Sequence, residues 1–217
     1  MKAFPTIPKP ILLTSLLLTF GCGSGEPSGP PVPSKAERLK TAEVIDQMRG
    51  YDPYFIGTPL NKVVNVGKPE SYVYTDTGVK LSAYRKTTIE VKVGDMIFEN
   101  MALYFGRSQE MQMYRFTRSL EQDITKARAE ARKKARTKPE EASDEGDEAE
   151  KLAALQLTHK QACESVYEKL SEAWGRGMPR GPGKLVWVGH EIEAFWEYSP
   201  IRGMPSCVFE VRAVQPR

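Results

Sequence analysis

The sequence predicts an α+β fold, in which an antiparallel β-sheet is covered on one face by a long helix. Three observations lead to this prediction. Apolar and polar residues alternate through much of residues 72–117, which is typical of half-buried strands. Residues 151–174 carry a wide apolar stripe at helical spacing, and three more strand-like segments follow in residues 185–214. Strands, a helix and further strands in one chain favour a sheet with a helix packed on one face.

The N-terminus has the features of an export signal. Residues 1–10 carry Lys2 and Lys9 and no acidic residue, and residues 11–20 form a mostly apolar run. A helix needs about 20 residues to cross a bilayer, so this run is too short to span one. Its length is typical of the apolar region of a secretory signal. We therefore expect residues 1–21 to be a signal peptide.

Cys22 follows this run and Gly21, and the arrangement resembles the lipidated cysteine of bacterial lipoproteins. The resemblance implies that acyl chains such as palmitate on Cys22 hold the protein at a membrane. In such lipoproteins a residue other than aspartate after the cysteine, here Gly23, favours the outer membrane over the inner one. The alternative is an ordinary signal peptide that happens to contain a cysteine.

Residues 22–40 are expected to be a flexible linker between the lipid and the folded domain. Residues 23–34 are mainly glycine, serine and proline with a single charge, a composition that cannot form a packed core. Residues 41–217 are then predicted to form a single α+β domain, which is a length that one core can support.

Two helices are expected before the first strand. The first covers residues 35–50, where four apolar residues recur three apart and Gly50 is expected to end the helix. The second has one to two turns, with Thr58 as its N-cap and Pro59 in its first turn. Gly67, in the left-handed conformation, is expected to end it.

Four or five strands with short connections are expected next, forming a meander. Residues 72–75 precede a turn, and residues 79–93 are predicted to form an antiparallel strand pair because their apolar residues alternate. After a turn at Gly94, one face of the following strand is expected to carry Ile97, Met101, Leu103 and Phe105.

Residues 119–150 are dominated by charge. Residues 119–138 have helical composition with only a thin apolar stripe, and residues 140–150 are acidic. Residues 126–150 are therefore predicted to be an insertion, either a charged helical hairpin or a disordered segment. A functional alternative is an arm that reaches toward a partner or an anionic membrane.

The helix from Lys151 is expected to cover the sheet. Its apolar positions recur three and four residues apart: Leu152, Leu155, His159, Ala162, Cys163, Val166, Tyr167, Leu170, Ala173 and Trp174. Residues 175–184 are predicted to be a loop because they are rich in glycine and proline. Three strands follow, with turns near residues 189–191 and 199–203.

The segment that holds Gly57, Val63, Gly67 and Pro69 is similar to the opening of small periplasmic lipoproteins of the outer-membrane assembly (SmpA/OmlA) type. The longer order of strands and helix resembles a set of bacterial α+β domains with the same opening, over residues 55–120 and 160–214. This resemblance implies a scaffold or interaction module in the cell envelope, and it brings no catalytic residues.

Cys163 and Cys207 are predicted to form a disulfide. Cys163 lies on the apolar stripe of the covering helix, and Cys207 shares the apolar face of its strand with Phe209 and Val211. Both therefore point into the interface between helix and sheet, and export would place them where disulfides persist. The alternative is two buried free thiols that behave as small apolar residues.

The sequence offers little material for catalysis or metal binding. His159 lies four residues before Cys163, and with His190 and Cys207 these residues make a two-Cys, two-His set. The spacing fits no zinc module, so no metal and no cofactor are predicted. No Gly-x-Ser-x-Gly elbow is present, and no catalytic residue is assigned.

A candidate binding surface consists of Trp187, Trp196, Tyr198, Arg176 and Arg180. If the aromatic side chains are exposed, they could recognise a peptide or a glycan. The alternative is that they pack between strands, and that the arginines belong to a mobile loop.

Removal of Lys2 and Lys9 with the signal lowers the formal charge from +3 to +1, which gives no reason to expect nucleic acid as a partner. The leading prediction is a cell-envelope lipoprotein whose non-catalytic domain faces the periplasm and binds or scaffolds another protein. The alternative is a small-ligand carrier or an enzyme that uses the open face of the sheet or residues 175–184.

Overall fold

The structure is a computed structural model that describes residues 31–63, 66–75, 78–86, 90–137, 148–201 and 204–214. The predicted signal peptide, Cys22, Gly23 and the predicted linker as far as residue 30 lie outside the described residues. Residues 138–147 of the predicted insertion also lie outside them.

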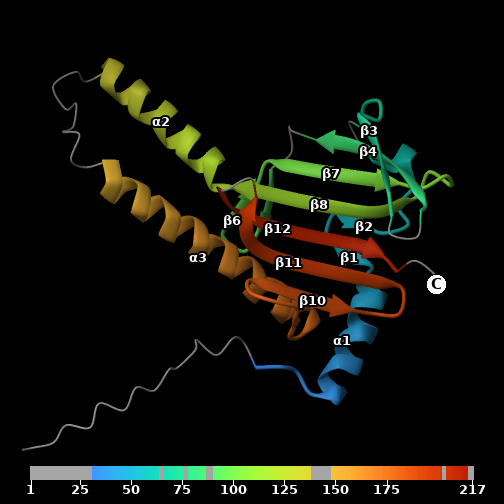
Figure 1. Cartoon of the computed structure of the whole chain (residues 1–217). Helices are drawn as coiled ribbons and strands as arrows, with labels where there is room; N and C mark the ends of the chain where they lie inside the picture. Colours follow the sequence, from blue (N-terminus) through green and yellow to red (C-terminus); the bar gives the residue numbers. More distant parts are fainter. Residues whose placement is uncertain are drawn as a thin grey trace, which may run out of the picture.

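An antiparallel sheet forms the centre of the molecule (Figure 1). Its strands are β3 Ser71–Tyr74, β4 Lys80–Lys86, β7 Asn100–Phe105, β8 Met111–Ser119, β9 Met178–Pro179, β10 Lys184–Val188, β11 Ile192–Ile201 and β12 Met204–Ala213. Their order across the eight-stranded sheet is β3-β4-β7-β8-β12-β11-β10-β9. Two meanders are thus joined where β8 pairs with β12.

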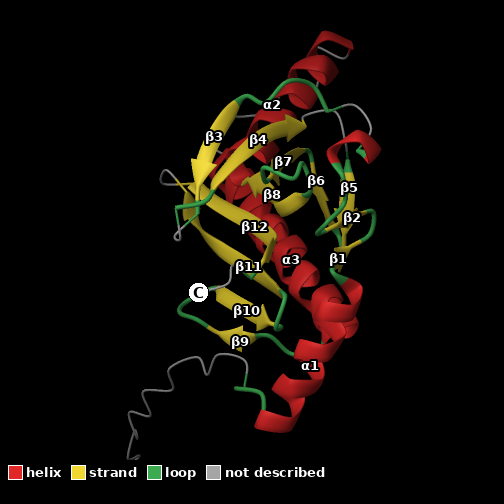
Figure 2. Cartoon of the chain, turned by 90° about the vertical axis from the view of Figure 1, so that its right-hand side faces the viewer, coloured by secondary structure: helices red, strands yellow, loops and turns green. Residues whose placement is uncertain are grey.

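Helices and two small hairpins cover one face of the sheet (Figure 2). The helices are α1 Lys35–Met48, α2 Leu120–Thr137 and α3 Glu148–Trp174. The hairpins are formed by β1 Gly50–Tyr51 with β2 Tyr54–Phe55, and by β5 Val91–Val93 with β6 Met96–Phe98. Among the described residues no helix packs on the opposite face. The predicted α+β fold with one covered face is therefore confirmed.

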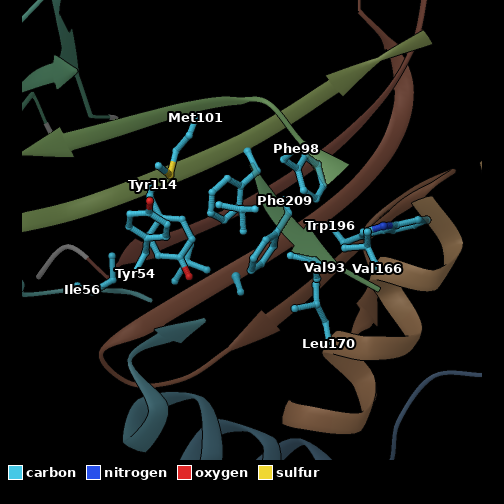
Figure 3. Packing of buried hydrophobic residues seen from close by; sticks show 14 of the residues in the cluster. Tyr54, Ile56, Val93, Phe98, Met101, Tyr114, Val166, Leu170, Trp196 and Phe209 are labelled. Carbon is cyan, nitrogen blue, oxygen red and sulfur yellow. The ribbon is translucent and has the colours of Figure 1, made fainter. Parts of the chain in front are cut away.

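The core lies between the sheet and this covering layer. Figure 3 shows Phe209 of the sheet among side chains from the layer above it, including Val93, Phe98 and Leu170. Each of these four side chains is at most 1% exposed. Burying a side chain of this size stabilises the fold by roughly 1.5–3 kcal/mol, so the packing of α3 and the β5–β6 hairpin on the sheet contributes strongly to stability.

The first helix begins and ends through identifiable local contacts. Ser34 and Glu37 form a capping box, in which the Ser34 hydroxyl accepts from the Glu37 N–H and the Glu37 carboxylate accepts from the Ser34 N–H. The helix therefore starts at Lys35, inside the range predicted as linker. The left-handed C-cap at its end is Arg49, with φ of 55°. Gly50, with φ of 151°, is required as well, since a Cβ there would lie 2.4 Å from the Tyr54 carbonyl oxygen.

The predicted helix after Thr58 is wrong in its helix type and in its caps. Among the described residues of this segment a 3-10 turn, Leu60–Lys62, is present; its N-cap is Pro59, and Gly67 is not left-handed. The reason is that the backbone around Thr58 is already paired as a strand would be. The Thr58 carbonyl accepts from the Met111 N–H, and Pro59 forms a β-bridge with Glu110.

Two strand predictions also need correction. Residues 79–93 do not form one strand pair, because β4 pairs with β3 and β7 while β5 pairs with β6 above the sheet. Ile97 is 40% exposed, whereas its neighbours Met96 and Phe98 are buried. Because β6 belongs to the covering hairpin and ends before Glu99, the alternation seen in β7 does not continue into it. Met101, Leu103 and Phe105 face the core as predicted.

The α2–α3 hairpin extends beyond the sheet (Figure 1). Its base is buried, with Leu120 1% and His159 3% exposed, whereas Leu152 is 40% exposed. The covering helix therefore packs on the sheet only from about His159 onward. The outer parts of α2 and α3 form a charged helical hairpin, one of the two predicted forms of the insertion.

Candidate functional site

The open face of the sheet carries a hollow of about 340 Å³. Directly opposite residues of antiparallel strands share a face, so Phe195, Glu210 and Arg115 form one row across β11, β12 and β8. The hollow is lined by Arg115, Thr117, Lys184, Phe195, Glu197, Ser199, Val208, Glu210 and Arg212. This hollow lies on the face of the sheet that the helices leave free.

The charges in and beside this hollow pair with one another. Arg115 donates to Glu210 over 2.6 Å, and Arg212 donates to Glu193 over 2.9 Å. Burial alone would lower the pKa of Arg115, but the adjacent carboxylate outweighs burial and raises it, so the guanidinium stays charged. Lys184 lies 3.4 Å from Glu197. Each of these three carboxylates therefore has a cationic partner.

Phe195 is the aromatic centre of the hollow. The Arg212 guanidinium carbon lies 4.4 Å from the ring centroid and the Lys184 ammonium nitrogen 5.6 Å from it. Both distances are within the range of cation–π attraction, which holds the ring and the two cations in place. The arrangement is a preformed surface of mixed polarity.

A second hollow, also of about 340 Å³, lies at the base of the α2–α3 hairpin. Arg118, at the end of β8, lies 2.7 Å from Glu99 and donates to Asp123 of α2 over 3.0 Å. The other oxygen of Asp123 lies 2.6 Å from Nδ1 of His159 on α3. Burial alone would raise the pKa of Asp123, but the hydrogen bonds from His159 and Arg118 outweigh burial and hold that pKa below its usual range.

An Asp–His pair is the feature that an enzyme could use, since the carboxylate orients the imidazole. Here Nε2 of His159 is buried and without a hydrogen-bond partner among the described residues. The one hydroxyl that lines this hollow belongs to Thr158, and it donates to the Ala154 carbonyl. Through these contacts the cluster forms a polar joint that ties α2 and α3 to the end of β8.

The predicted cysteine pair is bonded. The sulfurs of Cys163 on α3 and Cys207 on β12 form a disulfide, and both residues are fully buried. These cysteines therefore cannot serve as thiolate ligands in the two-Cys, two-His set that was considered for a metal. The His190 N–H donates to Asp46. Among the described residues no group of three or more potential metal ligands is found.

The candidate binding surface is not one surface. Trp187 and Trp196 are 1% and 7% exposed, and their indole N–H groups donate to the carbonyls of Gly175 and Cys163. They lie on the covered face of the sheet, so the alternative interpretation, packing within the fold, is correct for them. Tyr198 is half-buried beside His159, with ring centroids 5.9 Å apart.

Arg176 and Arg180 are exposed in the segment that follows α3. That segment, predicted as a loop, contains the short strand β9. The arginines are exposed whereas the two tryptophans are buried, so the described residues do not form the predicted joint surface.

Two features that sequence reasoning did not select are the Phe195 hollow and the exposed strand β3. Phe195 lies between the two tryptophan-bearing positions in sequence, on the opposite face of β11 from Trp196. The alternation of the strand separates these two faces but does not reveal which of them the helices cover.

Among the described residues no helix is both long and apolar enough to cross a membrane. Comparisons of the chain with protein-family models, with curated proteins and with solved structures find no match.

Proposed function

We propose that the protein is a cell-envelope lipoprotein, held at the membrane by lipid on Cys22, whose non-catalytic domain binds a partner protein. The observation that carries the proposal is the open face of the sheet. It is preformed, mixed in polarity and lined by charges that neutralise one another. Protein interfaces combine aromatic and arginine side chains in this way, whereas catalysis needs a group with a free lone pair or proton.

Two further observations support export. The buried disulfide joins α3 to β12, and such bonds persist in oxidising compartments. The N-terminal sequence resembles a lipoprotein signal ending at Cys22. The likeness of the segment around Gly57 to SmpA/OmlA-type lipoproteins supports an interaction role in the envelope.

A small-ligand carrier or enzyme is the second candidate. The hollow around Phe195 supports it, because about 340 Å³ falls in the lower range of ligand pockets. Against it, the polar groups there are satisfied within the sheet, so a small polar ligand would have to break existing ion pairs.

The tether is tested with Cys22→Ser. Intact mass and membrane fractionation of native protein are expected to give acyl mass at Cys22 and membrane retention, with release of the variant. An unacylated, soluble wild type would contradict the lipoprotein proposal.

Partner binding is tested by photo-crosslinking in intact cell envelopes. The crosslinking residue is placed at Thr117 or Ser199, beside Phe195, and at Glu168 on the solvent side of α3 as the matched control. A discrete protein adduct is expected from the two sheet positions and not from the control. The carrier would be favoured if neither sheet position gives an adduct and if a small molecule protects Phe195 from modification or quenching.

A further inference from the structure

The two edges of the sheet differ. The β9 edge consists of two residues, one of which is Pro179, and proline has no N–H to offer another strand. At the other edge, β3 has four residues, Ser71–Tyr74, with neither charge nor proline. Tyr72, Val73 and Tyr74 are 56%, 37% and 65% exposed. Among the described residues no strand pairs with the outer side of β3.

The direction of the free backbone groups follows from the pairing with β4. The Thr75 N–H donates to the Val79 carbonyl over 2.9 Å, and groups that face the partner strand alternate along an antiparallel pair. The N–H and C=O groups of Val73 therefore face β4, and those of Tyr72 and Tyr74 point outward. They are spaced about 7 Å apart, as another strand requires.

The side chains around this edge suit an extended segment with apolar residues. Val73 lies opposite Leu81 on the open face and continues the buried cluster formed there by Leu81, Ala83 and Tyr104. Tyr72 lies on the other face, and the Lys80 ammonium is 3.8 Å from its ring centroid, which orients the ring. A residue placed beside Val73 by an added strand would extend the apolar cluster.

From this geometry we propose that β3 is a docking edge, to which an extended segment of the partner protein adds as a further strand. The inference rests on the proposed function, since it assumes that the partner is a protein. Main-chain hydrogen bonds to Tyr72 and Tyr74 supply the affinity, and an apolar side chain beside Val73 supplies selectivity.

A second copy of the chain is not the occupant. A stable interface needs roughly 800 Å² and 20–30 residues on each side. β3 has four residues, so two copies joined through it alone would bury far too little surface. A short extended peptide can bind as an added strand with a smaller area, because main-chain hydrogen bonds to the edge supply much of its affinity.

The test uses synthetic peptides of about six residues that alternate threonine with valine, isoleucine, leucine or phenylalanine and end in glutamate. Hydrogen exchange of the whole mature domain is followed by NMR. Bound peptide is expected to slow exchange at the Tyr72 and Tyr74 amides about tenfold and to leave the Val73 amide, already bonded to β4, unchanged. N-methylation of the peptide amides on the β3-facing side is expected to abolish binding, and N-methylation of the other set is not.

Two variants complete the test. Tyr72→Pro removes an outward N–H, and Val73→Lys places a charge at the edge; each is expected to weaken peptide binding about tenfold. The control is Ile97→Lys, because Ile97 on β6 is 40% exposed, much like Val73. Urea midpoints confirm that each variant folds.

Amide protection that appears without peptide and grows with protein concentration would identify a second copy and overturn the proposal. Equal peptide binding by wild type and both edge variants, or no protection with any peptide, would also overturn it. The proposed function fails separately, since crosslinks from Thr117 or Ser199 in the Val73→Lys variant would still report a partner on the open face.

Discussion

Cys163 of α3 and Cys207 of β12 form a disulfide that joins the covering helix to one of the two central strands, with Cα atoms 5.6 Å apart. The two residues are 44 positions apart, and closing a loop of that length restricts the unfolded chain by about 4 kcal/mol in the entropic model. The bond therefore restrains the unfolded chain across α3 and three strands, β9 to β11.

Replacing both cysteines by alanine is expected to lower the free energy of unfolding by about 2–4 kcal/mol. Urea denaturation followed by tryptophan fluorescence measures the change, since Trp174, Trp187 and Trp196 are buried beside this interface. Wild type that is reduced while unfolded and then refolded should match the variant, and reductant should not affect the variant. Equal midpoints for reduced and oxidised wild type would contradict the prediction.

Asp46 is expected to be important for holding α1 against the turn between β10 and β11. Its carboxylate accepts from the N–H groups of His190, Glu191 and Ile192 over 2.6, 2.9 and 3.0 Å. Asp46→Ala should lower the free energy of unfolding by about 1–3 kcal/mol, and Asp46→Asn by less because one acceptor oxygen remains.

The control for Asp46 is Glu43→Ala on the same helix, since Glu43 is exposed. Gly189→Ala is expected to resemble Asp46→Ala, because a Cβ at Gly189 would lie 2.2 Å from the Asp46 carboxylate oxygen. A urea midpoint for Asp46→Ala equal to that of Glu43→Ala would show that water replaces the carboxylate at no cost.

The pair formed by Asp123 and His159 should make stability depend on pH. The pKa of Asp123 is lower in the folded protein than its ordinary value of 3.8, because His159 and Arg118 stabilise the carboxylate against the opposing effect of burial. Its contribution is therefore fully present above pH 3.8 and is lost as the pH falls through the folded-state pKa.

Asp123→Asn is expected to be less stable than wild type at neutral pH, and the difference should shrink as the medium is acidified. Urea midpoints of both proteins between about pH 7 and about pH 2 measure it. Glu121→Gln serves as the control, because Glu121 is an exposed carboxylate two residues before Asp123 on α2. A difference that stays constant down to the lowest pH would exclude an ionised Asp123 as its source.

The outer part of the α2–α3 hairpin is expected to contribute little to the stability of the domain. Replacing residues 126–150 by about four Gly/Ser residues bridges the two adjacent helices, whose axes lie about 8–10 Å apart. The deletion keeps Asp123, His159 and the buried base, so the free energy of unfolding should change by less than about 1 kcal/mol.

Circular dichroism should report the lost helix, while urea unfolding reports stability. If the deletion unfolds the domain, the hairpin is an integral part of the fold. If the domain folds but loses the crosslinked adduct at Ser199, the alternative of a partner-binding arm is favoured.

Local patterns predicted most of the elements. Alternation is visible in β10, β11 and β12, and the stripe from Cys163 to Trp174 is visible in α3, because side-chain spacing in strands and helices is a property of the backbone. The disulfide was predictable for the same reason, since both cysteines lie on apolar faces. The helix after Thr58 failed because nonlocal backbone pairing with residues near Met111 replaced a local cap.

The binding features could not be predicted from local patterns. Trp187 and Trp196 share the covered face, and Phe195 lies on the other, but alternation is the same whichever face the helices choose. The position of β3 at an edge likewise depends on which strands become neighbours.

The sequence by itself determined the alternating strands, the apolar half of α3 and the facing cysteines, because these depend on residues only a few positions apart. The tertiary structure alone decided which face of the sheet is covered, which strand is an edge and which charges meet. The pairing of β8 with β12 set all three, for example by bringing Arg115 opposite Glu210, 95 positions away. That pairing is favourable only because it buries apolar surface between segments distant in the chain, a gain that no local window contains.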